Sequence, residues 1–214
     1  MERLIELDRI DVSLGGLPIL RDIDLSVGPG DSLGVTGPNG VGKTTLLRVA
    51  ATLLAPASGS GSVLGAALGT PEAYAVRPRI GLLAHRPSLI PELTLGENLR
   101  HAANLAGLDA ARAQTALRVV GLDDVASRRA DASSFGMLRR TEMARLLITT
   151  PRLLLLDEPF TGLDVEAQEL IGALVARTTS DGGAVMMVSH DSGHLAAHTN
   201  RLLSMAGGRL EQKS

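Results

Sequence analysis

The chain has 214 residues, 44% of them hydrophobic, which suffices for one folded domain with a substantial core. No run approaches the ~20 consecutive apolar residues of a membrane span, and no signal-type leader opens the chain, so we expect a soluble cytosolic protein. A net charge of −2 and a content of one tyrosine, two phenylalanines and no tryptophan argue against nucleic-acid binding, and the lack of cysteine excludes disulfides, thiol catalysis and cysteine-based zinc sites.

The first third of the chain has the pattern of short strands separated by glycine turns. Strands are expected at residues 4–7, 10–14, 19–20 and 23–27. A short buried strand at 32–36 leads into a glycine-rich loop, and the helical spacing of apolar residues over 44–54 predicts a helix that Pro56 ends. Small residues then suggest hairpin turns around a short strand at 62–64.

The remainder of the chain alternates between strands and helices, with one long helical stretch in the middle. Strands are expected at 80–83, 153–156, 184–189 and 202–205, and helices at 95–105, 110–120, 137–149 and 165–177, with a short helix before the last strand. This order predicts a single α/β domain over residues 1–214, with a mostly parallel sheet, an N-terminal antiparallel β lobe and an inserted helical lobe over about 90–150.

The glycine-rich loop satisfies the pattern G-x-x-x-x-G-K-[ST] between a strand and a helix, which predicts a P-loop ATPase core. The nine residues expected to bind nucleotide are Gly37, Pro38, Asn39, Gly40, Val41, Gly42, Lys43, Thr44 and Thr45. Glycines let backbone N–H groups converge on phosphate oxygens at a helix N-terminus. Lys43, one of only two lysines, would place a positive charge on the phosphates, and Thr44 would offer a hydroxyl to Mg²⁺. The alternative is a chance glycine turn.

Two carboxylates follow the apolar run 153–156, at the end of a predicted buried strand. Ligand sites in open parallel sheets lie at the carboxyl ends of the strands, so Asp157 and Glu158 are expected to face the same crevice as the glycine loop. Asp157 would hold Mg²⁺, largely through water, and Glu158 would orient or deprotonate an attacking water. The alternative is an acidic pair that caps a surface strand.

Three further segments resemble motifs of ABC-type ATPases, in the order found in that family. Residues 157–164 are similar to the Walker B segment and D-loop, 189–191 to the segment with the switch histidine, and 134–140 to the signature motif. The resemblance covers essentially the whole chain. It identifies the chain as similar to the ATP-binding subunits of transporters, with ATP and Mg²⁺ as its ligands.

The resemblance implies a head-to-tail dimer with two nucleotides at the interface. The Ser134 hydroxyl and the N–H groups of Gly136 and Met137 would contact the γ-phosphate bound by a second ATP-binding subunit, and His190 would hydrogen-bond the γ-phosphate. Asp164 would lie at the dimer contact, although it also fits an N-cap of the following helix. The implied partners are integral membrane permease subunits, on the inner face of the cell membrane, with their contact surface at residues 85–91 and the helical lobe.

The sequence departs from the family pattern at three places. Leu14 stands where an aromatic residue usually stacks on adenine, which predicts weaker and less base-selective binding of ATP. The signature keeps Ser134 and Gly136 but replaces three other residues (Ser133, Phe135 and Met137 stand there). His85 stands where a glutamine is expected. A neutral imidazole could approach Mg²⁺ or the attacking water, so His85 is a fourth catalytic candidate beside Glu158, His190 and Lys43. The alternative is an ordinary exposed loop histidine.

Segments 85–87 and 93–99, together with 135–137, resemble the ATP-binding subunit of the haem exporter used in cytochrome c maturation. The alternatives are an ABC export ATPase for another cargo and a degenerate nucleotide-sensing module. A soluble ABC ATPase acting on DNA or ribosomes would require a long coiled-coil insertion or a second ATPase unit, which this sequence does not contain.

Overall fold

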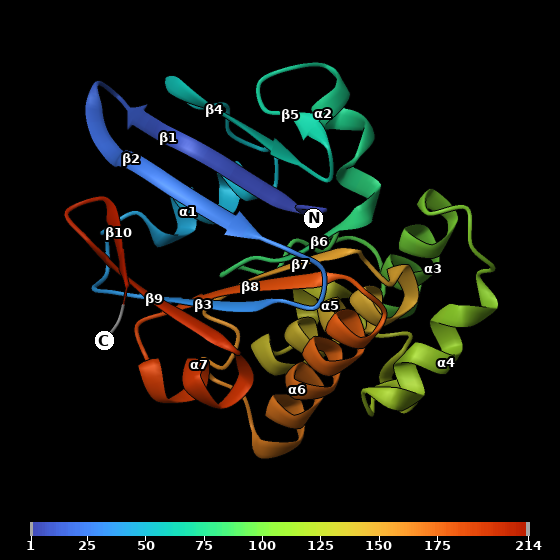
Figure 1. Ribbon diagram of the computed structural model, residues 1–214. Helices are drawn as coiled ribbons and strands as arrows, with labels where there is room; N and C mark the ends of the chain where they lie inside the picture. The colour runs from blue at the N-terminus through green and yellow to red at the C-terminus, as the bar shows by residue number, and fades with distance from the viewer. Residues whose placement is uncertain (1, 213–214) are drawn as a thin grey trace.

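The computed structural model describes residues 2–212 and contains two sheets with helices between and around them (Figure 1). The smaller sheet is antiparallel, in the order β2-β1-β4-β5. Its strands are β1 (Ile5–Leu14), β2 (Leu17–Val27), β4 (Ser58–Val63) and β5 (Ala66–Ala67). This sheet is the predicted antiparallel β lobe.

The larger sheet has six strands in the order β10-β9-β3-β8-β7-β6. Its strands are β3 (Ser32–Thr36), β6 (Ile80–Leu83), β7 (Leu153–Asp157), β8 (Ala184–Ser189), β9 (Arg201–Ala206) and β10 (Arg209–Gln212). All pairs are parallel except that of β9 with β10. Because β3 and β7 are neighbours of β8 in a parallel arrangement, their carboxyl ends meet at one edge of the sheet.

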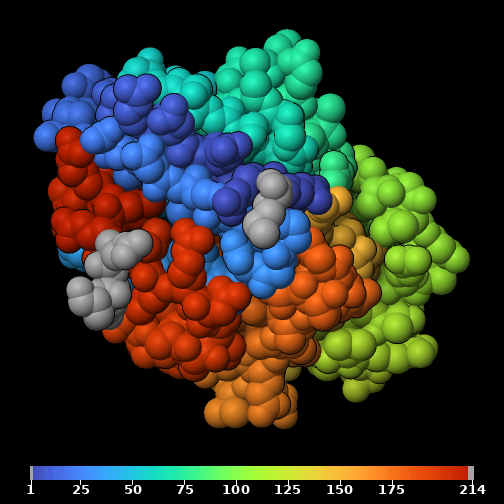
Figure 2. Space-filling model, viewed as in Figure 1, coloured from blue at the N-terminus to red at the C-terminus, as the bar shows by residue number. Residues whose placement is uncertain are grey.

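The helices of the described residues fall into two groups. One group covers the large sheet: α1 (Lys43–Ala50), α6 (Val165–Ser180) and α7 (Ser192–His198). The other group is the helical lobe, in which α3 (Leu95–Leu105) and α4 (Ala111–Val119) lie to one side of the core (Figure 2), and α5 (Phe135–Thr149) packs both against them and under the large sheet (Figure 1). Shorter pieces are α2 (Glu72–Ala75) and the 3₁₀ turns η1 (Arg77–Arg79), η2 (Asp123–Val125) and η3 (Ala130–Ala132).

The large sheet is buried on both faces, and its strands divide their side chains between two cores. In β7, Leu153 and Leu155 face α1 and the β lobe, whereas Leu154 and Leu156 face α5 and α6. This alternation follows from the two-residue period of a strand, and it explains why β7 is an uninterrupted apolar run. Figure 1 shows α1 between the two sheets and α6 beneath the larger one.

Several boundaries differ from the sequence prediction. Two predicted strands form a single β1 that bends at Arg9, where φ is 47° and the N–H donates to Asp24 (2.8 Å). Helix α1 ends at Ala50 instead of residue 54, because Thr52 adopts a φ of 58° and is held by Arg77, which donates to the Thr52 carbonyl (2.6 Å). Strand β10 and helix α2 were not predicted.

Candidate functional site

The loop between β3 and α1 is built for close approach of an anion. Gly40 and Gly42 have φ angles of 78° and 116°, in the region that glycine adopts without strain, and a Cβ on Gly37 would lie 2.5 Å from the Met205 carbonyl oxygen. Lys43 is only 7% exposed, and its Nζ donates to the carbonyls of Gly37 (2.6 Å) and Pro38 (3.0 Å). The ammonium group is therefore held over the loop, and within residues 2–212 its hydrogen bonds reach no anionic group.

Thr44 and Asp157 meet at the carboxyl edge of the sheet, where the Thr44 hydroxyl donates to Asp157 Oδ2 (3.0 Å). The Asp157 side chain is 4% exposed. Burial raises the pKa of this carboxyl group, and the neighbouring charge of Glu158 raises it further. A buried oxygen donor set whose charge is poorly solvated fits Mg²⁺, which takes hydroxyl and carboxylate oxygens as ligands.

Glu158 is fixed in an unusual backbone conformation, with a φ of 47°. Its carboxylate accepts hydrogen bonds from the Ser189 hydroxyl (2.7 Å) and the His190 N–H (2.9 Å), and His190 Nδ1 lies 3.0 Å from Oε2. Burial opposes ionisation, but the bonds from Ser189 and His190 together lower the pKa of Glu158 below its ordinary value. Glu158 is thus an ionised, oriented carboxylate at neutral pH, as a general base requires.

These groups share one cavity of about 400 Å³. It is lined by Ile19, Asn39, Gly40, Gly42, Lys43, Thr44, Thr45, His85, Asp157 and Glu158. The structure therefore brings together most of the predicted phosphate-binding, metal-binding and catalytic residues, and it places the exposed His85 on the same wall. Of the other predicted residues, Gly37 and Pro38 accept from Lys43, Val41 packs against the β-lobe core, and His190 reaches the site through Glu158.

The predicted signature residues are not among the residues that line this cavity. Ser134 is the N-cap of α5, and its Oγ accepts from the Met137 N–H (3.3 Å). A Cβ on Gly136 would meet nothing within 4 Å, and Phe135 is 45% exposed. The beginning of α5 therefore presents an open surface outside the cavity of its own chain.

Asp164 is the N-cap of α6, where its side chain accepts from the Ala167 N–H (2.9 Å). The same carboxylate accepts from Arg140 Nη2 at 2.7 and 2.8 Å, so the D-loop-like segment is tied to α5. Sequence reasoning missed this link. It also missed Ile19, which lines the cavity, and the hydrogen bond from Ser189 to Glu158. The only sign of this bond in the sequence was that Ser189 directly precedes His190.

Comparison with known proteins agrees with this geometry. A family profile described as ABC transporter matches residues 20–161. The chain is 35% identical to the Fe(3+) ions import ATP-binding protein FbpC 2 of Rhodococcus jostii over 99% of its length, and it spans 62% of that relative. It is 38% identical to the cytochrome c biogenesis ATP-binding export protein CcmA 2 of Cupriavidus metallidurans, over 88% of this chain and 90% of the relative.

Among solved structures, a dimeric ATP-binding cassette in a post-hydrolysis state, bound to ADP and Pi, superposes with a TM-score of 0.86 at 25% identity. The match covers 98% of this chain and 97% of that cassette. Within residues 2–212, none of the helices combines the length and the apolar character needed to cross a membrane.

Proposed function

This chain belongs to the ABC transporter family of ATPases, and from that premise we propose that it hydrolyses ATP to drive a separate integral membrane permease. The observation that carries the proposal is the shared cavity, in which Lys43 and Thr44 at the beginning of α1 converge with Asp157 and Glu158 at the end of β7. A phosphate-binding loop, a metal-binding pair and an oriented carboxylate are the groups that hydrolysis of a triphosphate requires.

In the proposed mechanism, loop N–H groups and Lys43 bind the phosphates, and Thr44 and Asp157 hold Mg²⁺. The metal ion, when bound, neutralises charge on the phosphate oxygens. Water attacks the γ-phosphorus, the bond from this phosphorus to the oxygen of the β-phosphate breaks, and ADP leaves. Glu158 receives the proton of the attacking water, and Ser189 and His190 keep its carboxylate ionised and aimed. His85 lies on the wall of the cavity, where its imidazole would contact the attacking water or a bound Mg²⁺.

We place the missing half of the site on a second copy of the chain. Ser134, Gly136 and Met137 lie outside the cavity of their own chain, and the N–H groups at the beginning of α5 are suited to an anion. The solved cassette of similar fold is described as dimeric. A homodimer would therefore close each site with the signature segment of the partner, on the cytoplasmic side of the membrane, where the permease contacts residues 85–91 and the helical lobe.

For the cargo, we propose haem export for cytochrome c biogenesis. Support comes from segments 85–87 and 93–99 and from the 38% identity to the cytochrome c biogenesis export protein. The name of the iron-import relative supplies the competing cargo. Deletion of the gene should remove haem-stained c-type cytochromes and leave uptake of radioactive Fe(3+) unchanged; the reverse result would favour iron import.

The catalytic assignment is tested with Glu158→Gln, which keeps the shape of the side chain and removes its basicity. We expect ATP turnover to fall by about 10²-fold or more, while ATP binding persists and an ATP-bound dimer accumulates in light scattering. Glu169→Gln, on the exposed surface of α6, is the matched control and should turn over ATP at the wild-type rate. Equal rates for Glu158→Gln and wild type would refute the assignment. Absence of turnover in wild type would favour a nucleotide sensor.

A further inference from the structure

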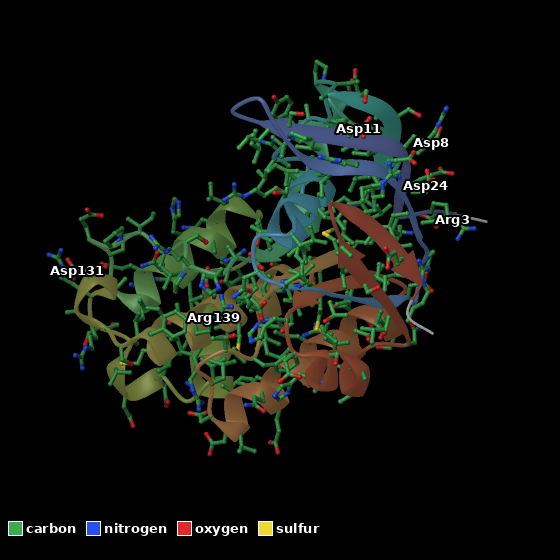
Figure 3. All side chains as sticks on the ribbon, turned by 90° about the vertical axis from the view of Figure 1, so that its left-hand side faces the viewer. Arg3, Asp8, Asp11, Asp24, Asp131 and Arg139 are labelled. Atoms are coloured by element: carbon green, nitrogen blue, oxygen red, sulfur yellow. The ribbon has the colours of Figure 1, made fainter. Side chains whose placement is uncertain are left out.

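Helix α5 carries a buried ion pair that the proposed mechanism does not use. Arg139 and Glu142 are 1% and 0% exposed, and Arg139 Nη1 lies 3.5 Å from Glu142 Oε2. A buried ion pair is a weak device for stability, because desolvation of two charges offsets most of their attraction. The position of this pair, between the helical lobe and the catalytic strands, indicates another role; Figure 3 marks Arg139 near the middle of the molecule.

Arg139 binds three backbone carbonyls that belong to two parts of the catalytic site. Its guanidinium donates to the carbonyl of Ala84, the residue before His85, and to the carbonyls of Asp157 (3.2 Å) and Glu158 (3.4 Å). Its guanidinium carbon also lies 6.0 Å from the ring centroid of Phe135, at the beginning of α5. One side chain therefore contacts the loop after β6, the end of β7 and the signature segment.

Glu142 extends the same link to the loop at 85–91. Its Oε1 accepts from both the N–H (2.9 Å) and the hydroxyl (3.0 Å) of Ser88, which is exposed. Within the described residues, Glu142 Oε2 and Arg139 Nε are buried without a hydrogen-bond partner. The contact of 3.5 Å between Arg139 Nη1 and Glu142 Oε2 is therefore an ion pair without a well-formed hydrogen bond, and the hydrogen bonds of the two side chains go instead to backbone carbonyls and to Ser88.

We propose that Glu142 and Arg139 are positioning residues that make the catalytic strand and the signature segment respond to the position of the Ser88 loop. Displacement of Ser88 pulls on Glu142 and shifts its partner Arg139, which holds the backbone of Asp157 and Glu158. The effect on the rate of hydrolysis rests on the proposed function, whereas the mechanical link does not.

The link is tested first without any activity, by hydrogen–deuterium exchange of the purified protein. Ser88→Ala removes one of the two bonds to Glu142 from an exposed position. We expect faster exchange at 84–91 and also at 134–140, with 37–45 unchanged. Ser88→Thr, which keeps the hydroxyl, should restore slow exchange, and Ser127→Ala, an exposed serine elsewhere in the helical lobe, should change neither segment. Acceleration confined to 84–91 would overturn the proposal.

Steady-state turnover of MgATP is the second measurement. Loss of one hydrogen bond should lower kcat of Ser88→Ala by about 2- to 10-fold, with the affinity for ADP measured without Mg²⁺ unchanged, because the phosphate loop is not part of the link. Glu142→Gln should behave in the same way. An unchanged kcat in folded variants would contradict the coupling. Lack of turnover in wild type would instead refute the proposed function, and the exchange data would still decide whether the link exists.

Discussion

At the scale of single residues, Asp157 and Glu158 are neighbours whose pKa values shift in opposite directions. Burial raises the pKa of Asp157, which means that the folded state is less favourable when this carboxyl group is ionised. The free energy of unfolding therefore decreases as pH rises from 3.8 through the folded pKa of Asp157. Hydrogen bonds from Ser189 and His190 outweigh burial at Glu158, so its contribution is present above 4.5 and is lost as pH falls through its lower folded pKa. The charge of Asp157 is thus poorly stabilised by its surroundings, whereas the charge of Glu158 is well stabilised.

Asp157→Asn should therefore stabilise the nucleotide-free protein at pH 7. The amide removes a poorly solvated charge and can still accept from Thr44. We expect a gain of roughly 1 kcal/mol, which corresponds to about 2–4 °C in Tm for a chain of this length. Calorimetry without Mg²⁺ measures the gain, and the rise in Tm that we expect MgADP to cause in wild type should be lost in the variant. A lower Tm for the variant would contradict the role assigned to burial.

At the scale of elements, the hairpin of β1 and β2 carries the position at which the family resemblance predicts a side chain stacked on the nucleotide base. Leu14 and Leu17 pair across its end and are 38% and 68% exposed, and Ile19 follows on the wall of the cavity. Aliphatic side chains offer no flat face for stacking, which contributes about 1–3 kcal/mol per nucleic-acid base where it has been measured. We expect MgATP and MgGTP to bind with dissociation constants within about 3-fold of each other. Calorimetric titration of both nucleotides checks this, and a strong preference for ATP would show that another group recognises adenine.

Helix α3 begins with a complete capping box, in which Thr94 Oγ1 accepts from the Glu97 N–H (3.1 Å) and Glu97 accepts from the Thr94 N–H (2.8 Å). Thr94→Ala should lower stability by about 1 kcal/mol, since it leaves a helix N–H without its partner. The affinity for MgADP should stay at the wild-type value, because α3 does not line the cavity. Urea denaturation and nucleotide titration separate the two effects. A parallel loss of affinity would mean that the helical lobe supports the phosphate site.

Elements with a strong local sequence pattern were predicted closely. The discrepancies occur where contacts between residues far apart in the sequence determine the boundary of an element. The uninterrupted apolar run of β7 and the spacing of α3 identify them directly. The end of α1 could not be predicted, because Thr52 is fixed by Arg77, which lies 25 residues away. The residues of the candidate site were likewise predicted where a local motif identifies them and missed where only a long-range contact does. Lys43 and Asp157 belong to recognisable motifs, whereas the bond between Glu142 and Ser88 joins residues 54 positions apart that no motif connects.

At the scale of the whole molecule, the helical lobe and the core are joined through α5. Arg139 and Glu142 connect it to β7 and the loop after β6, and Arg140 connects it to Asp164 at the beginning of α6. The beginning of α5 is open and lies outside the cavity of its own chain. In the proposed homodimer each site is incomplete in one copy, which predicts that two differently damaged copies can restore one another.

Complementation tests that prediction directly. Lys43→Ala should abolish turnover by disabling the phosphate loop, and Ser134→Glu should abolish it by placing a negative charge where the signature segment meets a phosphate. In a mixed head-to-tail dimer both defects fall in one site, and the other site combines the intact loop of one copy with the intact signature of the other. An equimolar mixture should therefore recover up to about a quarter of wild-type turnover, since half of randomly formed dimers contain one intact site. Each variant alone serves as the control at the same total concentration. If the mixture stays as inactive as its components, each nucleotide must be hydrolysed within a single chain.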